Sequence, residues 1–309
     1  MRRFFESAGM AVVLLLLVIG CSIWVPFFTA PLNIQGLLLS VALIGMIATT
    51  MLFCLAAGDF DLSVGSTVAL SGVLSAVMVK TLGWPVWAAV LAPLGVGMFI
   101  GYINGFVIAR VGINALITTL ATMQIVRGVA MLISKGESIG ISNERLISLG
   151  DWHYLGLHAH VWYMIALVAI FGFLLNRTVF GRNALAVGGN AEAARLSGVS
   201  VTRVKIGIFV LQGLVAAFAG VMLAARSSTG NPNSSLGLEL QVISGCVLGG
   251  VSLTGGIGTI SGVVVGVMIM GIVQNAMTLL SIGEFWQGVV SGTVLLAAVM
   301  LDRLKARKQ

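Results

Sequence analysis

The chain has 309 residues, of which 58% are apolar and only 9% are charged. Because soluble domains carry charge on about a quarter of their residues, this composition excludes a water-soluble fold and predicts a protein surrounded mostly by lipid. The net charge of +7 does not indicate nucleic-acid binding, because the Lys and Arg residues flank apolar segments and form no basic stripe.

Ten apolar runs follow one another along the chain, each close to the roughly 20 residues that cross a membrane as a helix. Several runs are short or interrupted by glycine, a residue that lets helices approach closely in lipid. We therefore predict an all-α polytopic membrane protein with about ten transmembrane helices, some broken by Gly, in one transmembrane domain over residues 1–309. The predicted spans are Met10–Phe28, Leu32–Ala57, Leu62–Val79, Trp84–Ala109, Ala115–Ser134, Val161–Leu175, Val204–Ala225, Leu238–Leu253, Ile257–Leu280 and Phe285–Leu301.

Basic residues between the runs predict the orientation. With the N-terminus placed inside the cell, most Lys and Arg residues fall on the cytoplasmic side, as the positive-inside rule requires. The outward minority comprises Lys80, Lys135, Arg145 and Arg226. This pattern predicts that both termini are cytoplasmic, that residues 176–205 form an inward loop and that residues 135–160 form an outward one.

Asp59 and Asp61 lie between the second and third runs. A carboxylate at the edge of lipid usually indicates a function or a specific partner. One role is structural, because a carboxylate can accept backbone N–H bonds at the start of the next helix and so hold a discontinuous helix. The alternative is direct contact with substrate hydroxyl groups along a pathway. The position of the two residues favours the structural role.

The fifth run is the most polar of the ten. Asn114, Thr118 and Thr122 are spaced by four residues and therefore share one helix face, and Arg127 follows about one turn later. Polar faces inside a membrane bundle point to water or to other helices. These side chains, together with Asn104 and Asn275, are candidates for lining a translocation path, and interhelical hydrogen bonding is the open alternative. For Arg127 we expect pairing with Glu137 or Glu239, or snorkelling to the interface.

The outward loop contains His153, His158 and His160. We expect this loop to be irregular and without an acid-rich frame, and all three histidines to lie outside the helices, so we predict no metal site. The three cysteines of the chain lie in apolar runs without CxxC spacing, which argues against disulfides and metal binding.

The inward loop is expected to contain a short surface helix. Asn190 can cap its N-terminus, Glu192 lies in the first turn, where a carboxylate favours the helix dipole, and Gly198 ends it. Ala193, Ala194 and Leu196 offer a small apolar face for another protein. From the residues alone, an ordinary connection resting on lipid headgroups is equally consistent.

The segment Glu192-Ala193-Ala194-x-x-x-Gly198 resembles the core of the EAA loop, the coupling element of ABC import permeases. Downstream, Ile206-Gly207-Ile208-Phe209 replaces the Ile-x-Leu-Pro ending of the longest-known members. The match is closer to the monosaccharide branch, and it extends along nearly the whole chain, through Gly58–Gly65, Asn104–Ala109, Asn114–Met123 and Cys246–Leu253. Within that branch, Gly58–Asp61 and Met123–Gly128 look most like the L-arabinose permeases. Ribose, xylose and galactose are the alternatives.

This resemblance implies a permease subunit of an ATP-driven sugar importer in the bacterial inner membrane. Its coupling residues would be Asn190, Glu192, Ala193, Ala194, Arg195 and Gly198. Its expected partners are a cytoplasmic ABC ATPase that binds ATP and Mg²⁺, an external sugar-binding protein, a second permease copy and membrane lipid. The chain has no phosphate-binding loop, so we expect it to hydrolyse no ATP itself and to carry no cofactor. A secondary transporter is the rival, and it would need intramembrane titratable groups that are scarce here.

Overall fold

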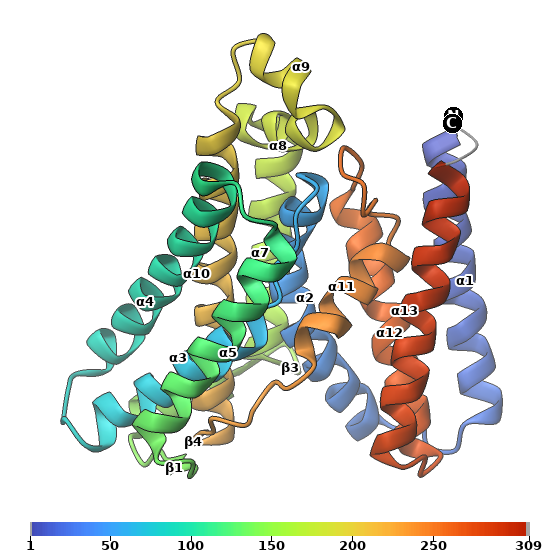
Figure 1. Ribbon diagram of the computed structural model, residues 1–309. Coiled ribbons are helices and arrows are strands. Elements are labelled where there is room, and N and C mark those ends of the chain that lie inside the picture. Colours follow the sequence, from blue (N-terminus) through green and yellow to red (C-terminus); the bar gives the residue numbers. More distant parts are fainter. Residues whose placement is uncertain (1, 307–309) are drawn as a thin grey trace.

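A computed structural model describes residues 2–306 and consists almost entirely of helices (Figure 1). Residue 1 and residues 307–309 of the expected domain lie outside the described residues. The helices are α1 (Arg2–Trp24), α2 (Pro31–Ala56), α3 (Val64–Lys80), α4 (Val86–Phe106), the π-helix η1 (Val107–Val111), α5 (Ala115–Ser134), α6 (Glu144–Asp151), α7 (Ala159–Arg177), α8 (Val179–Gly189), α9 (Ala191–Leu196), α10 (Val201–Ser227), α11 (Leu238–Leu248), α12 (Ile260–Leu279) and α13 (Glu284–Ala306). Two antiparallel pairs of short strands join β1 (Ile139–Gly140) to β4 (Thr229–Gly230) and β2 (His153–Tyr154) to β3 (Leu157–His158).

The predicted all-α polytopic architecture is confirmed. A helix lies at the place of each of the ten predicted spans, and six of the described helices, namely α2, α4 with η1, α5, α7, α10 and α12, are long and apolar enough to cross a membrane. The predicted span Leu238–Leu253 is too long, because α11 ends at Leu248 and Gly250 adopts a left-handed φ of 82°. Helix α3 is also short, and the described apolar part of α1 begins at Gly9.

Helix α2 forms the centre of the bundle (Figure 1). Apart from Leu43, every residue from Val41 to Ala56 is buried, and the helix packs against α7, α10, α11 and α12. Helices α4 and α10 cross closely: a Cβ added to Gly97 would overlap the backbone carbonyl of Gly213. Such an approach is possible because neither residue has a side chain, as expected where helices associate in lipid without a hydrophobic driving force.

Two interrupted connections lie side by side within the bundle. Residues 57–63 join α2 to α3, and residues 249–259 join α11 to α12. The backbone N–H of Gly256 donates to the carbonyl of Ala56 at 2.8 Å, which ties the second connection to the end of α2. In both places, buried polar backbone is satisfied by partners other than a continuous helix.

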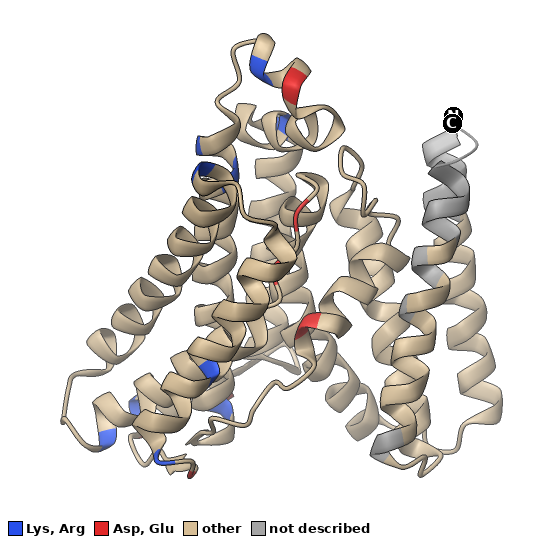
Figure 2. Ribbon diagram, in the orientation of Figure 1, with Lys and Arg blue, Asp and Glu red and all other residues tan. Residues whose placement is uncertain are grey.

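The two ends of the bundle differ. Helices α8 and α9 project from one end, and the start of α1 and the end of α13 lie toward that same end (Figure 1). Among the residues coloured in Figure 2, most charged positions lie toward the two ends of the bundle, and the middle is mostly uncharged apart from a few acidic positions. The opposite end carries segment 135–158, which is more ordered than expected because it contains α6 and three of the four strands.

Candidate functional site

The expected short helix in the inward loop is α9. The Oδ1 atom of Asn190 accepts the backbone N–H of Ala193 at 2.9 Å, so Asn190 caps α9 as its position in the sequence indicates. Glu192 forms a two-point ion pair with Arg195, with Oε1 2.6 Å from Nη2 and Oε2 3.0 Å from Nε. This hydrogen bond and the charge of Arg195 lower the pKa of Glu192. Gly198 follows the helix with a φ of +86°.

The apolar residues of α9 do not form one exposed face, contrary to the expected shape. Ala194 is buried at 6% exposure, whereas Ala193 is exposed and Leu196 is 75% exposed. Because successive helix positions are about 100° apart, Ala194 faces the protein while its neighbours face outward. The exposed surface of α9 therefore combines Leu196 and Ala193 with the Glu192–Arg195 ion pair.

Helix α8, which we did not predict, supports α9. Thr178 caps α8 by accepting the N–H of Gly181 at 3.3 Å. Near its C-terminal end α8 lies directly on the interrupted connections: a Cβ on Gly188 would overlap the carbonyl oxygen of Ala56 and lie 2.7 Å from the backbone nitrogen of Gly256. The consecutive glycines at 188 and 189 are the sequence signal for this close approach.

Asp59 has a different partner from the one the sequence suggests. Its carboxylate lies 2.8 Å from the Nζ atom of Lys205 in the second turn of α10, and the two side chains are 9% and 20% exposed. Asp59 therefore connects the α2–α3 segment to the helix that follows α9. The sequence shows Lys205 only as one of several basic residues of the inward loop, with nothing to mark its pairing.

Asp61 lies at the start of a hydrogen-bonded chain that we call the α3 anchor, formed by Asp61, Ser63, Asn104 and Thr122. The Oδ1 atom of Asp61 accepts the backbone N–H of Ser63 at 2.9 Å and its hydroxyl at 2.6 Å. The Nδ2 atom of Asn104 donates to the Ser63 hydroxyl at 3.0 Å, and the Thr122 hydroxyl donates to the Oδ1 atom of Asn104 at 2.7 Å. The α3 anchor joins the start of α3 to α4 and α5, and Asp61 and Asn104 are almost completely buried.

The other predicted path residues are also engaged in hydrogen bonds, although Asn114 is exposed. Asn114 caps α5 by accepting the N–H of Leu116 at 2.9 Å, and the Thr118 hydroxyl donates to the carbonyl of Asn114 at 3.0 Å. Asn275 and Asn33 donate to one another at 2.7 and 3.0 Å across α12 and α2. The polar side chains that make these residues candidates for a path therefore form hydrogen bonds between helices or within one helix.

Arg127 of α5 and Glu239 of α11 form a second polar region. The guanidinium of Arg127 donates to the backbone carbonyls of Pro232 and Ser234, the latter at 2.9 Å. Glu239, in the first turn of α11, interacts electrostatically with Arg127, but the hydrogen bonds of the guanidinium go to these two carbonyls and not to the expected acidic partner. Gln124 lies three residues before Arg127, so both occupy one face of α5, and Gln124 is exposed.

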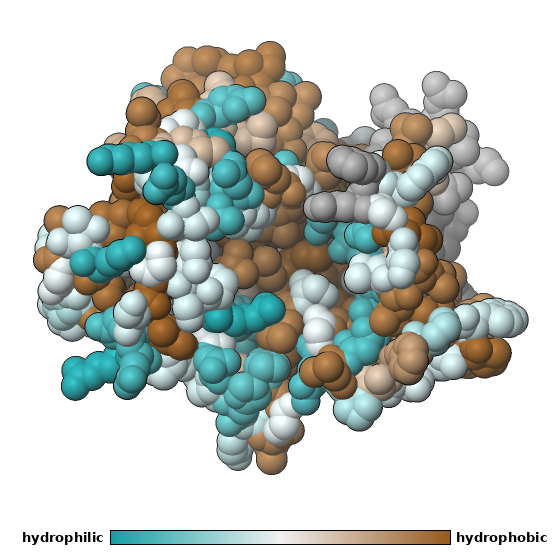
Figure 3. Space-filling view, turned by 90° about the horizontal axis from the view of Figure 1, so that it is seen from below, coloured by the Kyte–Doolittle hydropathy of each residue, from teal (hydrophilic) through white to brown (hydrophobic). Residues whose placement is uncertain are grey.

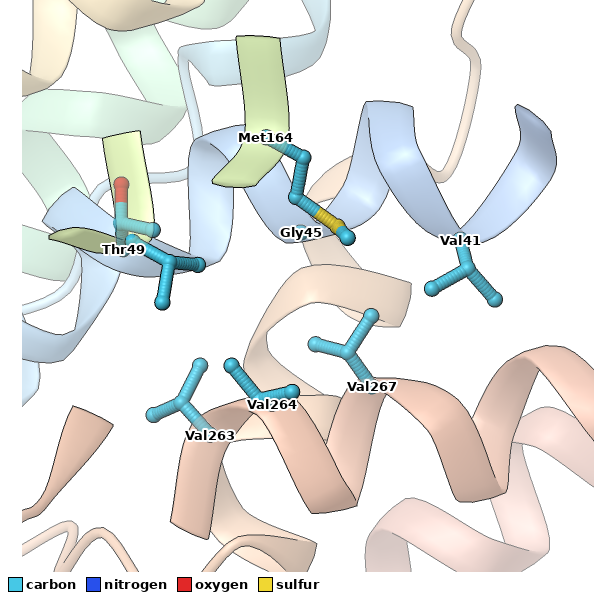
Figure 4. A pocket seen from close by; sticks show the side chains of 8 residues that line it. Val41, Gly45, Thr49, Met164, Val263, Val264 and Val267 are labelled. Carbon is cyan, nitrogen blue, oxygen red and sulfur yellow. The ribbon is translucent and has the colours of Figure 1, made fainter. Parts of the chain in front are cut away.

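Two cavities differ in what they could hold. Figure 4 shows a cavity of about 10 Å³ between α2, α7 and α12, lined mostly by valines and suited to neither a sugar nor a charged ligand. A larger cavity of about 250 Å³ lies at the end of the bundle opposite α9, and it is lined by Gly72, Gly220, Leu223, Ala224, Ser227, Thr229, Asn231 and Ser234. Figure 3 views this end and shows hydrophilic side chains around a hollow with apolar walls.

The long apolar helices, the interrupted connections and the helical projection at one end define a polytopic membrane protein. The chain belongs to the family described as branched-chain amino acid transport system / permease component, which it matches over residues 33–299. It is thus a transport subunit, as the sequence predicts.

Curated relatives are similar along nearly the full chain. The L-arabinose transport system permease protein AraH of Escherichia coli (strain K12) is 55% identical over 99% of this chain and 93% of its own length. The L-arabinose ABC transporter permease protein AraH of Azospirillum brasilense is 53% identical over 99% and 90%. The ribose import permease protein RbsC of Bacillus subtilis (strain 168) is 41% identical over 97% and 94%. No solved structure matches the chain. The predicted membership in the sugar-permease branch is confirmed.

Proposed function

We propose that this chain is the membrane-spanning subunit of an ATP-driven L-arabinose importer in the bacterial inner membrane. The observation that carries the choice of sugar is the 55% identity, along 99% of the chain, to the permease named for L-arabinose transport. In this proposal both termini and α9 face the cytoplasm, and segment 135–158 faces outward. The positive-inside rule supports this orientation, because the α9 end holds Arg110, Arg177, Arg182, Arg195, Arg203 and Lys205.

Helix α9 is the proposed docking element for a cytoplasmic ABC ATPase, which binds the ATP and Mg²⁺. The residues that serve docking are Asn190, Glu192, Ala193, Arg195 and Gly198, with Ala194 fixing α9 to the protein. The capped ends and the Glu192–Arg195 ion pair keep α9 a defined helix on an exposed projection. A force applied to α9 would reach the bundle through contacts at Gly188 and Lys205.

The contacts at Gly188 and Lys205 both reach the region where α2 ends and the α2–α3 connection begins. Gly188 touches the end of α2, and Lys205 holds Asp59 in the connection that follows α2. Four residues after Asp59, the α3 anchor holds the start of α3. We infer that displacement of α8 and α9 moves the α2–α3 connection and thereby alternates access to the path. What supports this coupling is the physical contiguity of packed and hydrogen-bonded groups between α9 and α3.

The path itself runs, in this proposal, along the face of α5 that carries Gln124 and Arg127, next to Glu239 at the start of α11. Intramembrane ionisable residues usually mark substrate pathways, and a side-chain amide suits the hydroxyl groups of a sugar. Asn104 and Thr122 join α4 to α5, Asn114 and Thr118 stabilise the start of α5, and Asn275 joins α12 to α2. The 250 Å³ cavity at the outward end, whose lining includes the hydroxyl groups of Ser227, Thr229 and Ser234 and the amide of Asn231, receives sugar from an external binding protein. A second permease copy completes the path.

Uptake measurements test the sugar and the energy source. The chain is expressed in a bacterium that lacks its own L-arabinose permease but retains the matching ATPase and binding protein. We expect restored uptake of radiolabelled L-arabinose and its loss when the ATPase gene is deleted. Restored uptake of ribose, xylose or galactose without L-arabinose would refute the sugar assignment. Uptake that persists without the ATPase would refute the importer and favour a secondary transporter.

A charge reversal tests the docking role of α9. Glu192→Lys is expected to abolish uptake and co-purification of the ATPase while leaving the amount of permease in the membrane unchanged. Glu144→Lys is the matched control, because Glu144 is also exposed, lies in the first turn of an asparagine-capped helix and belongs to the opposite end of the bundle. Normal uptake by the Glu192→Lys variant would contradict the assignment.

A further inference from the structure

The hairpin at the outward end brings together three side chains that can bind a metal ion. His153 and His158 are directly paired across β2 and β3, so their side chains emerge on the same side of the hairpin. Asp151 precedes His153 by two residues and ends α6. The ligand atoms of these three residues all lie within 4.8 Å of one another. The sequence does not show this cluster, because the pairing of His153 with His158 depends on where the hairpin turns.

The hairpin is held firmly enough to position these groups. Its turn has two left-handed residues, Leu155 at φ 50° and Gly156 at φ 76°, the combination typical of a two-residue hairpin. The Nε1 atom of Trp152 donates to the hydroxyl of Tyr163 at 3.1 Å, and the backbone N–H of Ala159 donates to the carbonyl of Trp152 at 2.8 Å. The base of the hairpin is thereby attached to α7.

The separation of the two imidazoles fits shared coordination. Their Nε2 atoms are 3.3 Å apart, and the ring centroids are 3.9 Å apart at an angle of 55°. Two nitrogens bound at about 2.0–2.1 Å to one tetrahedral Zn²⁺ lie roughly 3.3–3.4 Å from each other by geometry. The carboxylate of Asp151 offers a third ligand, and a water molecule would complete the four-coordinate set. We propose that Asp151, His153 and His158 bind a divalent transition-metal ion, Zn²⁺ in the first place.

His158 is the last of the three proposed ligands along the chain. His160, two residues further along, does not join the cluster: it lies inside α7 and is completely buried, which corrects the expectation that all three histidines lie outside helices.

The competing explanation is a hydrogen bond between the two imidazoles. A distance of 3.3 Å is long for such a bond, since N–H donors usually lie about 2.7–3.2 Å from their acceptors. A hydrogen bond between His153 and His158 would also not involve the nearby carboxylate of Asp151. The two explanations predict different metal binding. A metal site binds one ion per chain, and its affinity depends on all three residues, whereas a hydrogen-bonded pair predicts no such binding.

Metal titration of the full-length protein, purified without a histidine tag, distinguishes them. Co²⁺ is added, and the visible absorption bands of four-coordinate Co²⁺ are followed, then displaced with Zn²⁺. We expect one ion per chain, with binding weakened more than about tenfold in each of H153Q, H158Q and D151N, since even indirect support of a metal is worth about 10–100-fold. Glu144→Gln, which neutralises an exposed carboxylate of α6 outside the cluster, should leave binding unchanged.

The unmodified protein supplies a second readout, which needs no substitution and is therefore unaffected by any folding defect of a variant. With bound Cu²⁺, electron spin-echo spectroscopy should detect two equatorial imidazoles. Signals from two histidines together with the three losses of affinity support the site. Absence of stoichiometric binding, binding unaffected by the three substitutions, or a signal without histidine nitrogen would overturn it and leave the hydrogen-bonded pair. None of these outcomes bears on sugar transport, so the two proposals stand or fall separately.

Discussion

Replacing Lys205 by methionine tests the ion pair that joins α10 to the α2–α3 connection. The substitution retains much of the side-chain volume but leaves the carboxylate of Asp59, 9% exposed, without its cation 2.8 Å away. Removing one partner of a buried pair costs about 3–5 kcal/mol. Since Lys205 retains 20% exposure, water can partly compensate, and we expect the lower value, about 3 kcal/mol, or roughly a 100-fold shift in the unfolding equilibrium.

The assay is reversible unfolding in mixed detergent micelles, in which the denaturing detergent fraction is raised and helix content is followed. The double variant Asp59→Asn, Lys205→Met removes both charges and should recover most of the lost stability. Arg203→Met is the control, because it removes an exposed cation two residues before Lys205 on α10. If Lys205→Met costs no more than Arg203→Met, or if the double variant is as unstable as the single one, the ion pair has no structural role.

Two further substitutions test the contacts that lead from α9 into the bundle. Gly188→Ala should destabilise the protein by about 1–3 kcal/mol in the same unfolding assay and reduce sugar uptake, because the new methyl group would overlap the Ala56 carbonyl. Gly189→Ala is the control, because its Cβ would lie 3.9 Å from the nearest atom, and it should change neither stability nor uptake. Equal effects of the two substitutions would contradict the tight contact at Gly188. Asn104→Leu should lower the free energy of unfolding by about 1–2 kcal/mol, because it removes the middle of the α3 anchor. Thr122→Val removes one end of the anchor and should lower it by about 0.6 kcal/mol. A larger loss for Thr122→Val than for Asn104→Leu would contradict the network.

The sequence reveals the helices well and their connections poorly. A run such as Pro31–Ala56 is apolar on all sides, and a helix is the form in which lipid tolerates its backbone, so burial and helicity follow from composition. The cap at Asn190 is equally visible, because an asparagine two residues before a glutamate is a local signal. Local rules therefore suffice wherever the partners are neighbours in the sequence.

Partners that are distant in the sequence escape such rules. Asp59 and Lys205 are far apart along the chain, and only the packing of α10 beside α2 brings them together. Asn104 and Thr122 are visible in the sequence as polar groups inside a membrane, but a sequence shows no difference between an amide that lines a path and one that holds two helices. The pairing of His153 with His158 is hidden for a related reason, since two left-handed residues decide which positions face each other.

Thiol labelling along α5 tests where the path runs. Gln124 is exposed on the face that also carries Arg127, whereas Ile125 is 66% exposed about 100° further around the helix, and Thr119 is completely buried. If the path follows the Gln124 face, a membrane-impermeant thiol reagent should modify Gln124→Cys, and excess L-arabinose should slow the reaction. Ile125→Cys faces lipid in this arrangement and should react slowly.

The comparison separates exposure to water from exposure to lipid, which the surface of a single chain does not distinguish. Thr119→Cys should remain unmodified in folded protein, and the unaltered chain sets the background, because its three cysteines are buried. A Gln124→Cys variant that reacts no faster than Ile125→Cys would place this face of α5 in lipid. The polar groups at Gln124, Arg127 and Glu239 would then have to meet the second permease copy, and the path would have to run along another surface of the bundle.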